Sequence, residues 1–302
     1  MTRPSRRILV VLVLLVVGLL LVIVPVALRP GDTSTVSRRD PHRATNLSRS
    51  QMAGLLDAVA TVARSKSKAE LVAEGQQLFR SASVAKDGES CQGCHTNGGA
   101  NPDLGTVPHP QGPGDFTGRR DPPSLWGVSH TAPYFWVGNV PTLEGTVTAT
   151  INAHFKTGTS QPTAKTAEQA AAIVAYLDTI EAPVTPFDTG TMSPAAVRGE
   201  ALFRGKADCI ACHAGPLFTD NRLHNTNVPQ LPGGTDPGAP LPPGAFNTPT
   251  LRDARNTGPY MHNGVFTTLD QVVRFYNSQS SVAPLGLTDA EIGDLVAYLD
   301  AL

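Results

Sequence analysis

The chain has 302 residues, of which 40% are hydrophobic, and a formal net charge of −1 at pH 7. This length suits one large or two small domains, and a charge near zero argues against nucleic acid as a partner. The chain has 28 Gly and 26 Pro residues, and they are enriched in two stretches, 101–118 and 228–246. We expect these stretches to be long loops.

The first element is an unbroken apolar run from Ile8 to Leu28, preceded by three arginines. At about 1.5 Å per residue this run matches a hydrocarbon core of about 30 Å, so it predicts a transmembrane helix. Positive charge on the short leading side predicts that the rest of the chain lies on the periplasmic or extracytoplasmic side. The alternative is a cleaved signal peptide, but its apolar region is usually about 7–15 residues long. We therefore expect a single-pass membrane anchor at residues 1–28 and a tether at 29–68.

All four cysteines fall in two C-x-x-C-H motifs, formed by Cys91, Cys94 and His95 and by Cys209, Cys212 and His213. This motif attaches c-type haem: the thiols form thioethers with the vinyl groups, and the histidine supplies an axial ligand to iron. A zinc site would need four ligands per metal, and a redox dithiol needs no histidine after each pair. The motifs therefore predict two covalently bound haems, called haem 1 and haem 2 in chain order.

The two halves of the chain resemble each other. EGQQLFR at Glu74 corresponds to RGEALFR at Arg198, and AYLD occurs at both 175–178 and 297–300. Pro123 and Tyr134 correspond to Pro249 and Tyr260 at a constant offset. Each half therefore repeats a helix, a haem motif, a Pro/Gly loop, a Tyr-bearing segment and a closing helix. Both closing helices are predicted to be amphipathic. The apolar face of the first consists of Ile173, Leu177 and Ile180, and that of the second consists of Ile292, Leu295, Val296, Leu299 and Leu302.

This order resembles class I cytochrome c domains, and its duplication resembles the bacterial di-haem cytochrome c peroxidase and MauG superfamily. The similarity extends from about residue 70 to the C-terminus and is strongest in segments 122–147 and 249–276. The resemblance implies an all-α fold of two tandem cytochrome c-like domains, at 69–182 for haem 1 and 183–302 for haem 2. The predicted transmembrane helix would precede them.

The two Tyr-bearing segments differ at one position that matters for iron. Met261 stands in the second segment where Phe135 stands in the first. A thioether can bind iron and a phenyl ring cannot, and methionine ligation raises the reduction potential. We therefore expect haem 2 to be ligated by His213 and Met261 and to act as electron acceptor and store. A buried core methionine is the alternative for Met261, and Met192 is a competing ligand.

Haem 1 lacks that thioether, so it is either open or closed by another residue. In the family that the chain resembles, haem 1 binds peroxide, and a loop histidine caps it until the other haem is reduced. His109 falls in the matching loop, and His130 is a second candidate. Trp136 matches the family tryptophan that lies between the haems and couples them, although buried tryptophans are commonly packing residues.

The chain also departs from the family pattern. The distal glutamine and glutamate of the family fall on Thr146 and Lys156. Peroxide cleavage needs a group that moves a proton between the two oxygens. His154 is the candidate replacement, and its alternative role is structural.

The leading hypothesis is a membrane-anchored di-haem peroxidase that passes electrons from haem 2 to haem 1 and reduces hydrogen peroxide to water. Its electron donor would be a small cytochrome c, a copper protein or a quinol-linked donor, and related peroxidases add calcium as a candidate cofactor. The alternative is a di-haem electron-transfer cytochrome without peroxidase activity, which the missing glutamine and glutamate favour. MauG-like oxidation of a protein partner is disfavoured, because MauG-type proteins have a tyrosine at the position of Met261.

Overall fold

The computed structural model describes residues 53–54, 56–61, 66–81, 90–95, 107–108, 119–154, 164–234, 236–278 and 284–302. Its helices include α3 (Lys68–Arg80), α4 (Cys91–Cys94), α5 (Leu143–His154), α6 (Ala164–Leu177), α7 (Pro186–Thr189), α8 (Pro194–Arg204), α9 (Leu269–Ser278) and α10 (Asp289–Leu299). Short 3₁₀ helices, among them η3 (Val128–His130), η4 (Cys209–Ala211) and η5 (Ala254–Asn256), lie between them.

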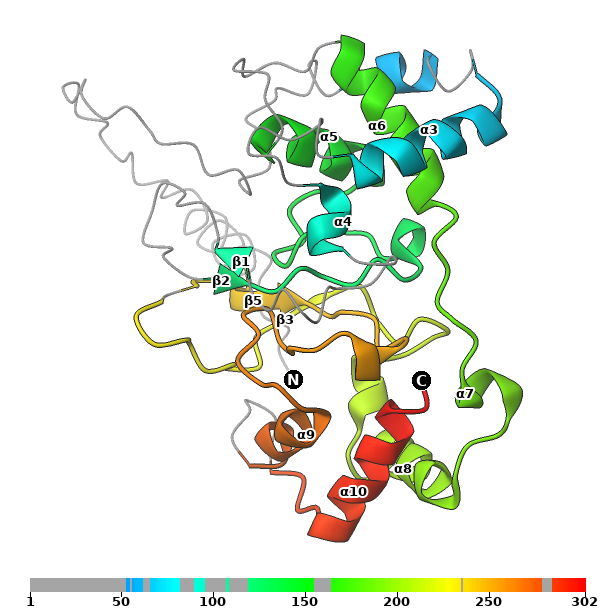
Figure 1. Cartoon of the computed structure of the whole chain (residues 1–302). Helices are drawn as coiled ribbons and strands as arrows, with labels where there is room; N and C mark the ends of the chain where they lie inside the picture. Colours follow the sequence, from blue (N-terminus) through cyan, green and yellow to red (C-terminus); the bar gives the residue numbers. More distant parts are fainter. Residues whose placement is uncertain are drawn as a thin grey trace, which may run out of the picture. The chain divides into compact units, whose positions relative to one another are not determined.

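In each half the opening helix crosses the closing helix: α3 packs against α6, and α8 packs against α10 (Figure 1). A glycine stands at each crossing. A Cβ added to Gly75 would overlap the Ala172 carbonyl oxygen, and one added to Gly199 would overlap that of Asp294. The sequence repeat therefore has a structural reason, because only glycine lets the two backbones approach so closely.

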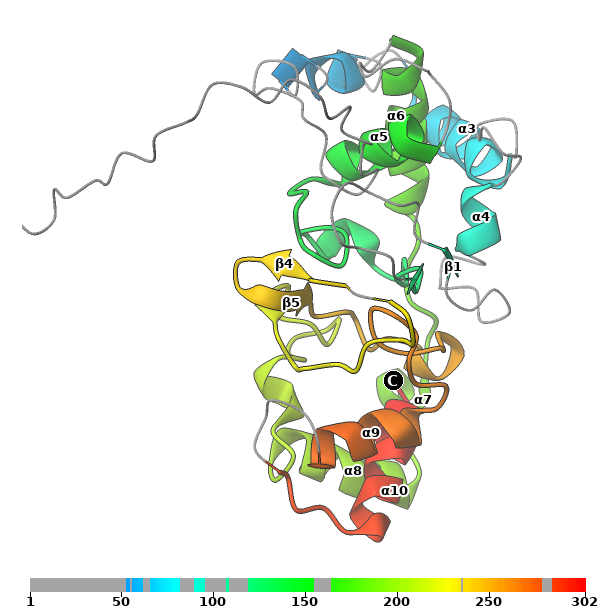
Figure 2. The same ribbon diagram turned by 90° about the vertical axis from the view of Figure 1, so that its left-hand side faces the viewer.

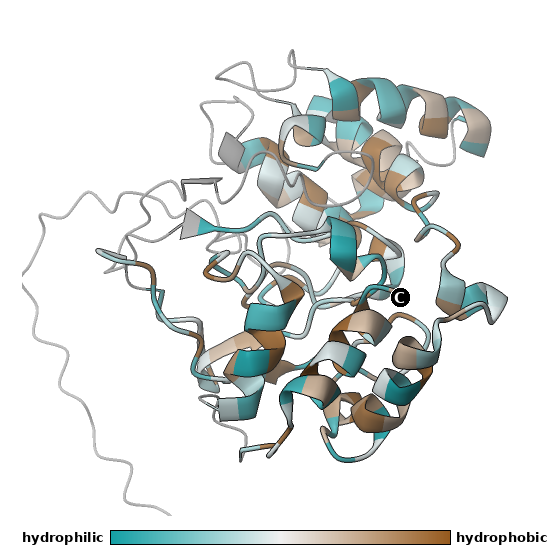
Figure 3. Ribbon diagram, turned by 60° about the horizontal axis from the view of Figure 1, so that its bottom comes forward, coloured by the Kyte–Doolittle hydropathy of each residue, from teal (hydrophilic) through white to brown (hydrophobic). Residues whose placement is uncertain are grey.

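Two hydrophobic clusters lie among the described residues, one in each half. The first includes Phe79 of α3 and Ile173 of α6, and the second includes Phe203 of α8 and Leu295 of α10. Apolar and hydrophilic residues alternate along these helices (Figure 3), as expected for amphipathic helices that cover a core. The domain boundaries at 69–182 and 183–302 stay a prediction.

Each half has a further helix, α5 or α9, between its Tyr-bearing segment and its closing helix; α9 packs on α10 (Figure 2). These helices were not predicted from the sequence, although a start signal for α9 is present. Thr268 Oγ1 accepts a hydrogen bond from Gln271 N, and Gln271 Oε1 accepts one from Thr268 N, both at 3.2 Å. Thr-x-x-Gln is a capping box.

The all-α prediction was wrong. A three-stranded antiparallel sheet of order β3-β5-β4 is built from β3 (Leu223–His224), β5 (Pro243–Asn247) and β4 (Ala239–Pro240). A second antiparallel pair joins β1 (Val107–Pro108) to β2 (Arg119–Arg120). Both sheets lie in the two Pro/Gly-rich stretches or at their borders. Even irregular segments must satisfy their backbone polar groups, and short antiparallel pairings do so here.

The predicted membrane anchor is not supported. No helix among the residues described is long and apolar enough to cross a membrane. The run from Ile8 to Leu28 lies outside the described residues.

Candidate haem sites

The second C-x-x-C-H motif presents a histidine prepared to bind iron. Cys209 begins η4, and the His213 backbone N–H closes the turn on the Cys209 carbonyl at 2.9 Å. His213 Nδ1 lies 2.9 Å from the Phe218 carbonyl oxygen, so Nδ1 is the donor and Nε2 keeps a free lone pair. Burial lowers the pKa of His213, which keeps the imidazole neutral. This hydrogen bond of the second ring nitrogen is what metal-ligating histidines ordinarily have.

The first motif forms one helical turn, α4, whose start is capped by Ser90. Ser90 Oγ accepts a hydrogen bond from Gly93 N at 3.1 Å. Burial lowers the pKa of His95 to about 4, and the Pro123 carbonyl acts in the opposite direction. The Pro249 carbonyl acts in the same way on His213. His95 Nδ1 has no hydrogen-bond partner within the usual distance and angle among the residues described. Both halves therefore offer a neutral, partly buried histidine one residue after the second cysteine, which fits covalent haem.

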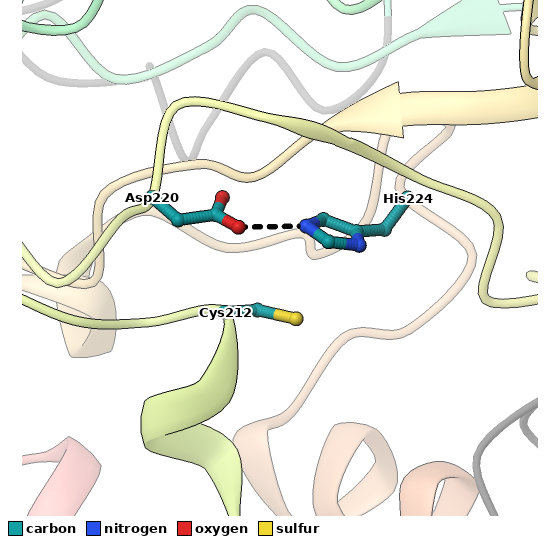
Figure 4. Close-up of side chains that lie close together, drawn as sticks. All are labelled: Cys212, Asp220 and His224. Carbon is teal, nitrogen blue, oxygen red and sulfur yellow. Dashed lines mark hydrogen bonds and ion pairs between the residues drawn. The ribbon is translucent and has the colours of Figure 1, made fainter.

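One group of ligating side chains, Cys212, Asp220 and His224, could instead hold a metal ion, as far as the described residues show (Figure 4). Their ligand atoms lie within 4.8 Å of one another. However, His224 Nε2 and Asp220 Oδ2 already pair with each other at 2.7 Å, and three ligands fall short of a closed zinc site. No disulfide joins any two of the four cysteines. Haem attachment therefore stays the prediction for Cys212, with the Asp220–His224 pair beside it.

The two Tyr-bearing segments adopt the same turn. Tyr134 pairs with Val140 in the first half, and Tyr260 pairs with Phe266 in the second. Phe135 and Met261, the next residue in each, both have a positive φ, of 61° and 71°. This conformation costs about 1–3 kcal/mol in a non-glycine residue and clusters at functional sites. The backbone is therefore repeated in both halves, while the side chain that the turn carries differs.

Tyr276 is a residue that the sequence analysis missed. Its hydroxyl is enclosed, and its pKa is raised mainly by burial, with smaller contributions from the thiols of Cys212 and Cys209. A hydrogen bond with Thr226 acts in the opposite direction. The phenol of α9 therefore lies within electrostatic range of the second haem motif, which the sequence pattern of α9 did not indicate.

Trp136 lies where residues of the two halves meet. Its Nε1–H donates to the Asp121 carbonyl at 2.7 Å, and Asp121 N–H donates to the His262 carbonyl at 2.9 Å. The Trp136 carbonyl accepts from Asn247 N at 2.8 Å. The indole also meets the edge of the His262 ring, with 6.4 Å between ring centroids. The Trp136 segment of the first half is thus held by residues of the second.

A buried ion pair reinforces the same contact. Arg120 Nε and Nη2 bind the two carboxylate oxygens of Asp236 at 2.7 and 2.8 Å. Burial alone would raise the pKa of Asp236, but these hydrogen bonds outweigh it and hold the pKa below its usual value. Asp121, by contrast, has no partner for Oδ1 among the residues described here, and burial raises its pKa to about 8.

The other residues predicted for the haem sites lie in different parts of the chain. His109 lies outside the described residues. His130 is exposed, and Met192 packs against the second hydrophobic cluster. His154 ends α5, and Thr146 precedes it by eight residues on that helix.

A repeated helix crossing with a C-x-x-C-H motif in each half defines a di-haem c-type cytochrome. The di-haem cytochrome c peroxidase family model matches residues 68–183. Cytochrome-c peroxidase IdrP1 of Denitromonas iodatirespirans is 32% identical over 82% of this chain and 85% of its own length. The methylamine utilization protein MauG of Methylorubrum extorquens is 30% identical over 77% and 78%. The chain belongs to the di-haem cytochrome c peroxidase and MauG superfamily, a family of peroxidase-type oxidoreductases, which confirms the resemblance.

Solved structures show the same fold. A MauG-like protein associated with microbial copper homeostasis has a TM-score of 0.64 at 21% identity and covers 77% of this chain and 89% of its own. The diheme peroxidase BthA of Burkholderia thailandensis, as its Y463M variant, has a TM-score of 0.62 at 22% identity, covering 76% and 85%.

Proposed function

We propose that this protein reduces hydrogen peroxide to water at haem 1, with electrons that enter at haem 2. One peroxide takes up two electrons and two protons and gives two waters. The observation that carries the proposal is the pair of matching turns at Phe135 and Met261. They bring the same backbone to both sites but leave haem 1 without a thioether ligand, as a substrate-binding haem requires. When bound, the two haems supply the iron at which peroxide is reduced and store the electrons.

The residues around haem 1 are proposed to control access and protons. His109 caps the iron until haem 2 is reduced, and it leaves only if its affinity differs between redox states. His154, the last residue of α5, moves a proton between the peroxide oxygens. Trp136 couples the two haems, and its hydrogen bond to Asp121 supports that assignment.

The sixth ligand of haem 2 is proposed to be Met261, with Tyr276 as the competing ligand. Met261 sits in a strained turn that the other half repeats. Tyr276 is favoured by its enclosed hydroxyl near the motif cysteines. A phenolate ligand would lower the potential of haem 2 relative to a thioether and bring the chain closer to MauG-like chemistry.

The haem-bearing residues are proposed to function outside the cytoplasm, with a small cytochrome c, a copper protein or a quinol-linked donor as electron source. Free thiols of exported proteins normally pair as disulfides. The four cysteines form no disulfide among themselves, which agrees with export if all four attach haem.

Spectroscopy of the half-reduced protein tests the proposal. Haem 1 is expected to become high-spin, to bind small ligands and to turn over peroxide with a reduced cytochrome donor. His109→Ala should make haem 1 high-spin already in the fully oxidised protein. A haem 1 that stays low-spin at every redox level, with no peroxide consumed, would establish the electron-transfer cytochrome instead.

A further inference from the structure

We propose that His262 is a positioning residue for electron transfer between the haems: its ring holds Trp136 and connects it to the turn that carries Met261. The inference rests on the proposed direction of electron flow, from haem 2 to haem 1, and on Met261 as the ligand of haem 2. In the step concerned, one electron leaves haem 2 and one arrives at haem 1, with no covalent bond made or broken.

His262 is buried without an evident polar role. It is 2% exposed, and its Nε2 has no hydrogen-bond partner among the residues that the structure covers. The nearest Asp236 oxygen lies 3.8 Å from Nε2, which is too long for a hydrogen bond. An unsatisfied buried nitrogen costs about 1–3 kcal/mol, so an apolar residue would serve packing better. The close contacts that the structure gives this side chain are instead those of its ring, with Phe246 and Trp136.

The ring of His262 is fixed between two aromatic rings. It stacks on Phe246 with 3.5 Å between centroids and an angle of 9° between planes. The Trp136 ring meets it edge-on at 71°. Phe246 and His262 come from the second half and Trp136 from the first, so the three rings form one aromatic contact across the two halves.

Hydrogen bonds run beside this aromatic contact. From the His262 carbonyl, the route to the Trp136 indole passes through the backbone of Asp121 alone, by hydrogen bonds of 2.9 and 2.7 Å. His262 follows Met261 directly in the chain. Electrons tunnel more readily through bonds, hydrogen bonds and ring contacts than across gaps, so the Met261 turn and Trp136 are well connected.

Neighbouring groups keep the rings in place. Arg120, paired with Asp236, stands 6.0 Å from the centre of the Phe246 ring. Asn247, next to Phe246 on β5, donates from its backbone N–H to the Trp136 carbonyl and from its side chain to the Pro133 carbonyl, the latter at 2.7 Å. A strand of the second half thus fixes the stack and the Trp136 backbone at once.

The test compares His262→Leu with His262→Phe in the full-length protein carrying both haems. Both variants remove the imidazole next to Met261, and only the phenylalanine keeps an aromatic ring. A photoreductant delivers one electron to haem 2, and absorbance follows its transfer to haem 1. The reduction potentials of both haems are measured alongside. We expect His262→Leu to slow the transfer about tenfold, the scale of substitutions along a coupling network, and His262→Phe to stay near the wild-type rate.

Equal rates in the two variants would overturn the proposal, whether both are slow or both unchanged. If the leucine variant does not retain two haems, Phe246→Leu replaces it. That change keeps the imidazole but removes its support, and a wild-type transfer rate there would also overturn the proposal. The measurement uses no peroxide. If the protein lacks peroxidase activity, the proposed function is wrong, but the transfer rates still decide the role of His262.

Discussion

At the scale of single residues, Asp121 combines a structural and an electrostatic anomaly. Its main chain joins Trp136 to His262, while its carboxyl is buried, lacks a partner for Oδ1 among the described residues and has its pKa raised from 3.8 to about 8 by burial. Between these two pKa values the unfolded chain loses the proton that the folded chain keeps. The folded state then binds more protons, so stability should fall as pH rises from about 4 to about 8.

Asp121→Asn should remove that loss, because an amide keeps the shape and cannot ionise. We expect the variant to be more stable than the wild type at pH 8 and close to it at pH 4, by denaturant unfolding monitored at both pH values. The Trp136 contact uses only the Asp121 backbone, so the haem spectra should not change. A constant stability difference between the proteins across this range would contradict the burial argument.

Met261 and Tyr276 make opposite predictions for haem 2. If Met261 is the ligand, Met261→Leu should lower the haem 2 potential and abolish the methionine–iron charge-transfer band, since the thioether stabilises ferrous iron. Tyr276→Phe should then leave that band and the potential unchanged. If the phenol is the ligand, the wild-type protein should lack the band, and Tyr276→Phe should raise the potential. Redox titration with visible spectroscopy of the three proteins decides between the residues.

At the scale of elements, the helix crossings depend on one glycine each. Gly199→Ala would force α8 away from α10, because the new Cβ would overlap the Asp294 carbonyl oxygen. Such overpacking typically costs about 1–3 kcal/mol. Thermal unfolding should show a lower Tm with the haem content retained.

Gly293→Ala is the matched control on the partner helix. A Cβ at Gly293 meets nothing within 4 Å, and the residue lies inside α10. Here alanine should stabilise the protein by about 0.5–1 kcal/mol, since glycine loses more conformational freedom in a helix. A similar effect of both substitutions would mean that close packing at Gly199 is not what the crossing requires.

The sequence revealed elements whose signals are local. The C-x-x-C-H motifs, the repeat and the amphipathic faces of α6 and α10 all depend on nearby residues. Strand pairing in the Pro/Gly-rich stretches was missed because strands of two to five residues are too short to show an alternating pattern, and because β3 pairs with β5 across about 20 residues of chain. The Trp136–Asp121–His262 connection was missed because His262 lies far from the other two residues in the chain. His262 stands next to Met261 in the sequence, but only the fold brings it against Trp136.

At the scale of the whole molecule, the two halves have similar frameworks and are proposed to have different tasks. The clusters around Phe79 and Phe203 are separate, so each half has its own apolar core. Loss of one haem should then leave the framework of the other half intact. The contacts of Trp136, Arg120 and Asp121 with the second half join the two halves, and under the proposed function they connect the two haem sites.

Removing the first haem attachment tests this division of tasks. Cys91→Ala combined with Cys94→Ala should leave one covalent haem per chain in a pyridine haemochrome assay, against two in the wild type. Because His213 is held by Phe218 of its own half, haem 2 should keep its spectrum and nearly its potential. Peroxide turnover should be lost, since its proposed site is gone, while a reduced donor should still reduce haem 2. The converse variant, Cys209→Ala with Cys212→Ala, should keep haem 1 but lose its reduction by the donor. Retained peroxide turnover in the first variant would place the reaction at haem 2 and reverse the assignment of the halves.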